Sequence, residues 1–158
     1  MRAGLRRVGT LKLSRESEYG LAGLIYLARR RPGAIVQLKD IAKARGLPPM
    51  FLAKTFRKLT HHGVLASYRG RRRGYALARP TKQISVREIL EGIDGRDIFM
   101  RCIFWSSRCS DDRPCSLHQM WQPVRPRMTA ALEQLTLDRL ARGSLRSRSR
   151  RRPGARVR

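Results

Sequence analysis

The sequence has few acidic residues and no long apolar run. Its 11 Asp and Glu residues stand against 36 Lys and Arg residues, so the 158-residue chain has a formal net charge of +25. Such an excess makes an anionic polymer the first partner to consider. No apolar stretch approaches the roughly 18 residues that cross a membrane, and none follows the basic N-terminus as a secretory signal requires. We therefore expect neither a membrane protein nor a secreted one.

Cysteine is also scarce. The 3 cysteines are an odd number and too few for a disulfide scaffold, which predicts a reducing, cytoplasmic location. Catalytic signatures are missing as well: there is no paired carboxylate, no phosphate-binding loop and no nucleophile beside a base. We therefore expect neither an enzyme nor a small-molecule substrate.

The positive charge is unevenly distributed. Residues 1–12 and 142–158 carry +12 between them, and the second stretch contains eight arginines and no acid. The intervening segment keeps +13, and apolar residues make up 41% of the chain, enough for one core. We expect one folded domain between a flexible basic extension and a disordered arginine-rich tail, both suited to gripping phosphates without regard to sequence.

Helical periodicity predicts three helices, over 14–30, 37–45 and 48–62. In the third, Leu52, Phe56 and Leu59 should face the core. The opposite face carries a cationic stripe of Met50, Lys54, Arg57, Lys58 and His61. A basic helix after a short helix and a turn is typical of a helix-turn-helix, although a solvated charged face is the alternative.

A basic hairpin follows. Strands over 64–68 and 75–77 flank the turn RGRRRG, which predicts a wing whose arginines reach phosphates or a minor groove. The fold class is therefore mainly α with a small β-wing, a winged helix-turn-helix over 13–95. The predicted DNA contacts are Met50, Lys54, Thr55, Arg57, Lys58, Arg69, Arg71, Arg72 and Arg73.

Two further helices are expected. One begins at a capping box formed by Ser85 and Glu88. The other, a long C-terminal dimerisation helix over 116–141, carries apolar residues at heptad spacing: Leu117, Trp121, Val124, Met128, Ala131 and Leu135. Such a seam suits pairing of two subunits, and packing onto the winged domain is the alternative.

All three cysteines lie in the loop 96–115, spaced as Cys102-x6-Cys109-x5-Cys115 and followed by x2-His118. Soft thiolates crowded into one loop suggest metal ligation, by zinc or an iron–sulfur cluster. The spacing alone does not separate zinc from an iron–sulfur cluster. The third interpretation is that these cysteines are ordinary loop thiols that bind no metal.

Residues 11–142 resemble a family of bacterial winged-helix transcription regulators that includes the iron–sulfur-cluster regulator IscR and the nitric-oxide-sensing repressor NsrR. The resemblance rests on KLSRESEYGLAGLIYLA, on LKDIAKARGLPPMFLAKTFRKLTHHGVLASYRGRRRGYALARP, on ISVREILEGID, and on the cysteine loop with CSLHQMW and LTLDRLA. The chain departs from that pattern by one extra residue in the first cysteine spacing and by arginines in a wing that is often glycine-rich.

The resemblance implies a homodimer that binds operator DNA and holds an iron–sulfur cluster on Cys102, Cys109 and Cys115. In some members the fourth ligand is the histidine that follows the third cysteine, which maps to His118. In others it is a carboxylate from the partner subunit, which maps to Glu18. A two-iron cluster is favoured, with a four-iron cluster as the alternative.

The predicted function is transcriptional regulation, as a repressor, by a cytoplasmic protein whose operator binding responds to a cluster that senses iron, redox state or nitric oxide. Two alternatives stay open. One is a winged-helix DNA binder with a zinc site or thiol redox switch. The other is a basic protein that binds nucleic acid without sequence preference.

Overall fold

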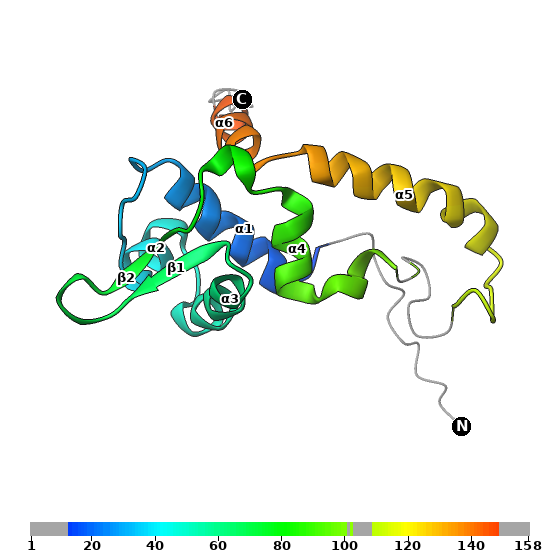
Figure 1. The fold of residues 1–158 in the computed structure, drawn as a ribbon, viewed down its shortest axis with the longest axis horizontal. Coiled ribbons are helices and arrows are strands. Elements are labelled where there is room, and N and C mark those ends of the chain that lie inside the picture. Colours follow the sequence, from blue (N-terminus) through cyan, green and yellow to red (C-terminus); the bar gives the residue numbers. More distant parts are fainter. Residues whose placement is uncertain (1–12, 101, 103–108, 149–158) are drawn as a thin grey trace, which may run out of the picture.

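Helices dominate the computed structural model, which describes residues 13–100, 102 and 109–148 (Figure 1). The elements are α1 (Arg15–Ala28), α2 (Leu38–Arg45), α3 (Pro49–His61), β1 (Leu65–Tyr68), β2 (Gly74–Leu77), α4 (Val86–Asp94), α5 (His118–Gln134) and α6 (Leu137–Arg148). Short 3-10 turns lie at η1 (Gly70–Arg72), η2 (Thr81–Gln83) and η3 (Arg96–Phe99). The predicted fold class, mainly α with a two-stranded wing, is confirmed.

Local sequence signals set the ends of the first three helices. The side chain of Ser14 caps α1 by accepting a hydrogen bond from the backbone N–H of Ser17 at 3.0 Å. Gly46 ends α2 in the left-handed conformation, at φ 63°. Pro49 occupies the first position of α3, where a missing N–H costs no helical bond.

The wing is an antiparallel pair. β1 and β2 align so that Leu65 lies opposite Leu77 and Tyr68 opposite Gly74. Val36, just before α2, exchanges two backbone hydrogen bonds of 2.9 Å with Tyr75 and so anchors the base of the wing to the helices. Gly74 is needed there, since a Cβ on it would lie 2.6 Å from the Val36 carbonyl oxygen.

The main core lies where α1, α3 and α4 meet. Its fully buried side chains include Leu24 of α1, Leu52, Phe56 and Leu59 of α3, and Ile89 of α4. These are the α3 residues that the sequence pattern assigns to the core. Ser85 caps α4 as expected, but Glu88 pairs with Arg79 rather than completing a capping box.

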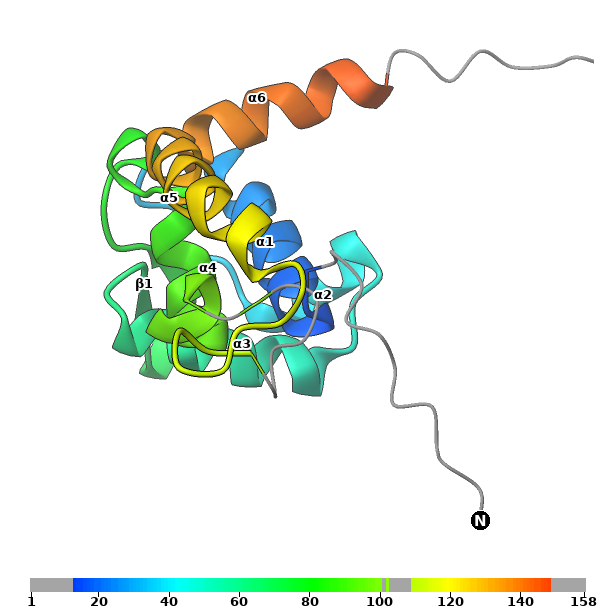
Figure 2. The ribbon, with the colours of Figure 1, turned by 90° about the vertical axis from the view of Figure 1, so that its right-hand side faces the viewer.

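The single C-terminal helix predicted over 116–141 is two helices. Leu135 is extended, its carbonyl accepts from the Val86 N–H at 2.7 Å, and the Leu137 N–H donates to the Ile84 carbonyl at 2.9 Å. These two bonds stitch the break onto the segment that leads into α4. The N-terminal end of α5 projects away from the winged domain, whereas α6 crosses α1, where Arg29 donates to the Ala141 carbonyl at 3.1 Å (Figures 1 and 2).

The limits of the terminal extensions also change. α6 continues through Arg148, so the predicted disordered tail does not begin at residue 142. Residues 1–12 and 149–158 lie outside the described part of the chain. Within the described part, none of the helices has the length and apolar character needed to cross a bilayer.

A matched pair of glycines tests the packing of α1 on α3. A Cβ on Gly23 would lie 2.8 Å from the buried ring of Phe56, whereas a Cβ on Gly143, inside α6, meets nothing within 4 Å. We expect Gly23→Ala to destabilise the fold by about 1–3 kcal/mol through overpacking. Gly143→Ala should be neutral or stabilise by up to about 1 kcal/mol through helix propensity. Denaturant unfolding measures both, and equal effects would contradict this packing.

Candidate functional site

The exposed face of α3 is cationic and partly apolar. Lys54 and Arg57 are exposed, and Met50 at the helix start is 82% exposed. Phe51, which the sequence pattern does not single out, is also exposed and contacts Tyr19 of α1 edge-on, with ring centroids 6.5 Å apart. This face is free to meet a partner.

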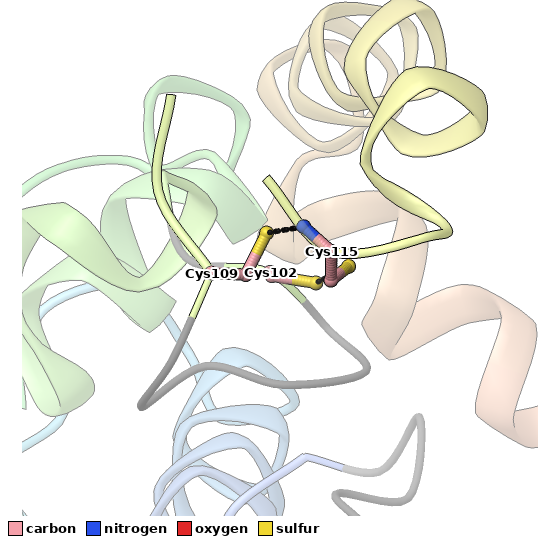
Figure 3. Close-up of side chains that lie close together, drawn as sticks. All are labelled: Cys102, Cys109 and Cys115. Carbon is pink, nitrogen blue, oxygen red and sulfur yellow. Dashed lines mark hydrogen bonds between the residues drawn. The ribbon is translucent and has the colours of Figure 1, made fainter. Parts of the chain in front are cut away.

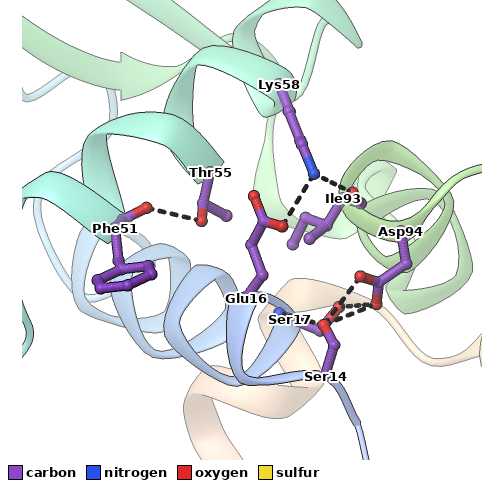
Figure 4. Close-up of polar contacts among 8 residues, drawn as sticks. All are labelled: Ser14, Glu16, Ser17, Phe51, Thr55, Lys58, Ile93 and Asp94. Atoms are coloured by element: carbon purple, nitrogen blue, oxygen red, sulfur yellow. Dashed lines mark hydrogen bonds and ion pairs between the residues drawn. The ribbon is translucent and has the colours of Figure 1, made fainter.

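Two residues assigned to that face lie elsewhere. Thr55 is fully buried and its hydroxyl donates to the Phe51 carbonyl at 3.0 Å, one turn back in the helix (Figure 4). Lys58 turns toward α1 and α4, where its ammonium lies 2.9 Å from a carboxylate oxygen of Glu16. Thr55 lies at i+3 from Leu52, so the helical period itself places it on the core side. Lys58 borders the exposed face, and its partners on α1 and α4 draw it inward.

A cleft of about 710 Å³ lies between the start of α2, α3 and the wing. Five basic side chains line it: Lys39, Arg57, His61, Arg69 and Arg73. None of the described lining residues is acidic, so the cleft presents an uncompensated positive field. Lys39 was missed from the sequence because α2 by itself shows no basic stripe; only the fold brings it beside the wing.

The wing tip adds further charge. Arg69, Arg71, Arg72 and Arg73 are all exposed, and η1 turns the chain tightly between the strands. The exposed face of α3 and the wing therefore form one continuous basic surface. Its shape and sign fit a nucleic-acid backbone beside a groove.

The three cysteines converge (Figure 3). Their Sγ atoms all lie within 4.8 Å of one another, and those of Cys102 and Cys115 are 3.9 Å apart. The backbone N–H of Cys115 also donates to the Cys109 Sγ at 3.5 Å. The loop thus brings together thiols that are well separated along the chain, as metal ligation requires.

His118 joins this group from the start of α5. It is 7% exposed, and its Nδ1 lies 3.2 Å from the Cys109 Sγ. Its Nε2 lies 3.3 Å from the Asp111 carboxylate, an arrangement that favours the proton on Nε2 and leaves Nδ1 facing the Cys109 thiol. Asp111 was missed because an acid in a polar loop gives no signal of its partner.

The donor set fits a metal or an iron–sulfur cluster: three thiols and one imidazole, of which Cys102 and His118 are buried. Glu18 is half-buried in the first turn of α1 and is not part of the thiol group in this chain. Of the arginines that the sequence places beside the thiols, Arg113 is exposed, and Arg101 and Arg108 lie outside the described residues.

The thiols influence one another. The pKa of Cys109 is raised overall: the Cys115 backbone N–H lowers it, but desolvation and hydrogen bonding with the side chains of Cys115 and Cys102 outweigh that bond. In the metal-free state Cys109 is therefore held as a thiol over a wider pH range than an isolated cysteine.

Comparison with known proteins gives a consistent result. The model of the Rrf2 family, described as iron-dependent transcriptional regulators, matches residues 13–143. A helix-turn-helix-type transcriptional regulator of Mycobacterium tuberculosis is 33% identical over 135 residues, covering 85% of this chain and 84% of that protein. CymR, the global cysteine regulator of B. subtilis, aligns at 25% identity with a TM-score of 0.70, covering 85% of this chain and 98% of that one. IscR of T. potens aligns at 26% identity with a TM-score of 0.67, covering 92% and 95%.

The mutual influence of the thiols is testable by alkylation of the reduced, metal-free protein. The double variant Cys102→Ala/Cys115→Ala removes the side chains that raise the Cys109 pKa but keeps the backbone N–H that lowers it. Because the thiolate is the nucleophile, the iodoacetamide rate profile of Cys109 should shift to lower pH than in the wild type. Mass spectrometry follows Cys109 in both proteins, and an unchanged profile would show that the thiols do not interact.

Proposed function

The chain belongs to the Rrf2 family of transcriptional regulators, and on that premise we propose that it is a homodimeric repressor whose operator affinity responds to an iron–sulfur cluster. The family consists of DNA-binding regulators rather than enzymes. The observation that carries the proposal is the convergence of three thiols, with His118 beside them, in a chain that also carries a winged helix.

DNA binding in this proposal uses α3 and the wing. Met50, Lys54 and Arg57 face the major groove from the exposed side of α3. The wing arginines, Arg69 and Arg71 to Arg73, contact phosphates or the adjacent minor groove. Thr55 and Lys58 are left out of this set because their polar atoms are bonded within the fold.

The cluster would be held by Cys102, Cys109, Cys115 and His118, as a two-iron cluster with a four-iron cluster as the alternative. Glu18 of a partner subunit is the alternative fourth ligand. When bound, such a cluster supplies a redox-active centre that oxygen and nitric oxide can attack. The loop leaves the winged domain at η3 and enters α5, so its ligands tie α4 to α5.

Dimerisation is proposed through α5. Its C-terminal half packs on the winged domain, where Met128 and Leu132 contact the cluster of Val86, Leu90 and Phe99. Its N-terminal half exposes Met120 and Val124. Along the heptad seam, Trp121 and Met128 pack within this chain, whereas Val124 and Ala131 are exposed and are available for subunit pairing.

A thiol switch is the second candidate, favoured by one distance. The Cys102 and Cys115 Sγ atoms are 3.9 Å apart, so a small loop adjustment brings them to the roughly 2.05 Å of a disulfide. Closing that bond removes two protons and two electrons, which a cellular oxidant such as a disulfide or peroxide accepts. Zinc on the same thiols is the redox-inert version of this alternative.

The metal content of protein purified without air separates these candidates. We expect a visible charge-transfer absorption band with iron and sulfide bound, and its loss in Cys102→Ala, Cys109→Ala and Cys115→Ala. Ser116→Ala, an exposed position next to the third cysteine, is the control that should keep the band. Colourless protein with one zinc per subunit would exclude the cluster. Comparison of His118→Ala with Glu18→Ala then identifies the fourth ligand by which variant alters the spectrum.

Sequence-specific binding is tested against the rival of a non-specific basic protein. A site selected from random duplexes should bind at least about 1,000-fold more tightly than a random duplex at physiological salt. Log affinity falls with log salt concentration, and Arg71→Ala/Arg72→Ala should make this slope less steep by about 0.9 for each phosphate that is no longer neutralised. Thr55→Val, buried in the same winged domain, should leave the slope unchanged. Equal affinity for both duplexes would exclude the regulator.

A further inference from the structure

Lys58 links the recognition helix α3 to the end of α4. Its ammonium donates to the Glu16 carboxylate at 2.9 Å and to the Ile93 carbonyl at 2.8 Å (Figure 4). Ile93 lies in the last turn of α4, where carbonyls lack helical partners and a cation is favoured by the helix dipole. Lys58 and Glu16 keep only 36% and 22% of their side-chain surface exposed. This pair is therefore better shielded than an ordinary surface ion pair.

A second set of bonds ties the same end of α4 to α1. The Asp94 carboxylate accepts from the Ser14 hydroxyl at 2.8 and 3.0 Å and from the buried Ser17 hydroxyl at 2.6 Å (Figure 4). Ser14 is the N-cap of α1, so the carboxylate also lies at the positive end of that helix dipole. The negative end of α4 thus meets a lysine, and the positive end of α1 meets an aspartate.

The junction of α1, α3 and α4 is closely packed, with no room for an added side chain at Gly20. A Cβ on Gly20 of α1 would lie 2.5 Å from the Ile93 side chain and 2.9 Å from that of Thr55. α1, α3 and α4 therefore meet around one point. Displacing the end of α4 must strain the contacts of α1 and α3 as well.

The chain leads directly from this junction to the thiols. After Asp94, Gly95 turns with φ 99°, η3 follows, and Cys102 is the third residue after the end of η3. A ligand that reorders the cysteine loop therefore acts on Asp94, whose carboxylate accepts hydrogen bonds from the Ser14 and Ser17 hydroxyls of the α1 N-terminus. Glu18, the other candidate ligand, lies in the same first turn of α1.

We propose that Glu16, Lys58 and Asp94 form a clasp that sets the orientation of α3 and transmits the state of the cysteine loop to it. The coupling part rests on the proposed cluster-dependent function. Lys58 is then a positioning residue: it acts through Glu16 and the end of α4, and not by contacting DNA. Lys54, one turn earlier on the exposed face, is the matched DNA contact.

The experiment compares Lys58→Met, Glu16→Gln and the double variant with Lys54→Met, on the full chain and a selected operator. Affinity is measured over a range of salt concentrations, with the cluster loaded and after its removal, and the absorption spectrum reports the cluster itself. Lys58→Arg, which keeps the positive charge and both donor functions, is the rescue variant. Thermal unfolding confirms that each protein is folded at the assay temperature.

Loading the cluster changes operator affinity by some factor in the wild type, upward or downward. The clasp predicts that Lys58→Met and Glu16→Gln each reduce this factor by about 5-fold or more. The double variant should show no more than either single change. The salt slope and the spectrum should stay as in the wild type, and Lys58→Arg should restore the wild-type factor. Lys54→Met should instead weaken both forms by the same factor and lower the slope by about 0.9.

Two results would overturn the clasp: Lys58→Met behaving like Lys54→Met, or Glu16→Gln keeping the wild-type factor. If wild-type affinity does not depend on the cluster, the proposed function fails first. The positioning role is then decided on cluster-free protein alone. Equal reductions of affinity for Lys58→Met and Glu16→Gln at an unchanged slope support it, and a reduction confined to Lys58→Met with a lower slope refutes it.

Discussion

The close approach of α1 to α3 and α4 is the contact on which the rest of the structure depends. Gly20 and Gly23 put backbone, rather than side chains, against Ile93 and Phe56, so the three helices pack at a shorter distance than larger residues would allow. Because of this spacing Lys58 reaches Glu16, and the exposed face of α3 is held outward by the buried apolar core on its other side. The wing is attached to the same unit through Val36 and Tyr75.

Because acidic residues are scarce, their positions decide which cations of the packed helices are neutralised. The described Glu residues that form ion pairs meet Lys58 on the inner side of α3, Arg79 after the wing and Arg87 of α4. The cleft between α3 and the wing has no acid among its lining residues. These glutamates therefore neutralise cations of the scaffold, and the cleft between α3 and the wing keeps a local positive charge with no acid beside it. A field organised in this way steers a polyanion toward that cleft, which a uniform excess of charge would not do.

Much of this arrangement could be predicted from the sequence, because it depends on local signals. Ser14, Ser85 and Gly46 mark helix ends through bonds within a few residues, and the glycines around RGRRRG mark the wing. Three features depend on contacts between distant segments and could not be predicted. The side taken by Lys58 is decided by Glu16 of α1 and the Ile93 carbonyl of α4. The break after α5 is decided by backbone pairing with the strand-like segment before α4. The contribution of Asp111 requires the folded loop that brings it to His118.

In the proposed function, the position of the thiol group links a bound cluster to DNA binding. Cys102 follows η3 at the end of the winged domain. Cys115 and His118 lie at the start of α5, the end of this helix that projects from that domain (Figure 1). A ligand bound to both sides joins α5 to α4 at a second point, in addition to the packing of Met128 and Leu132 at the far end of α5. Trp121, one turn after His118, is buried in this part of α5 as well, so a ligand on the thiols would reinforce an end of the helix that is already packed. In a dimer paired through α5, the angle of this helix to the winged domain determines the distance between the two recognition helices, and half-site spacing on DNA admits only a narrow range of distances.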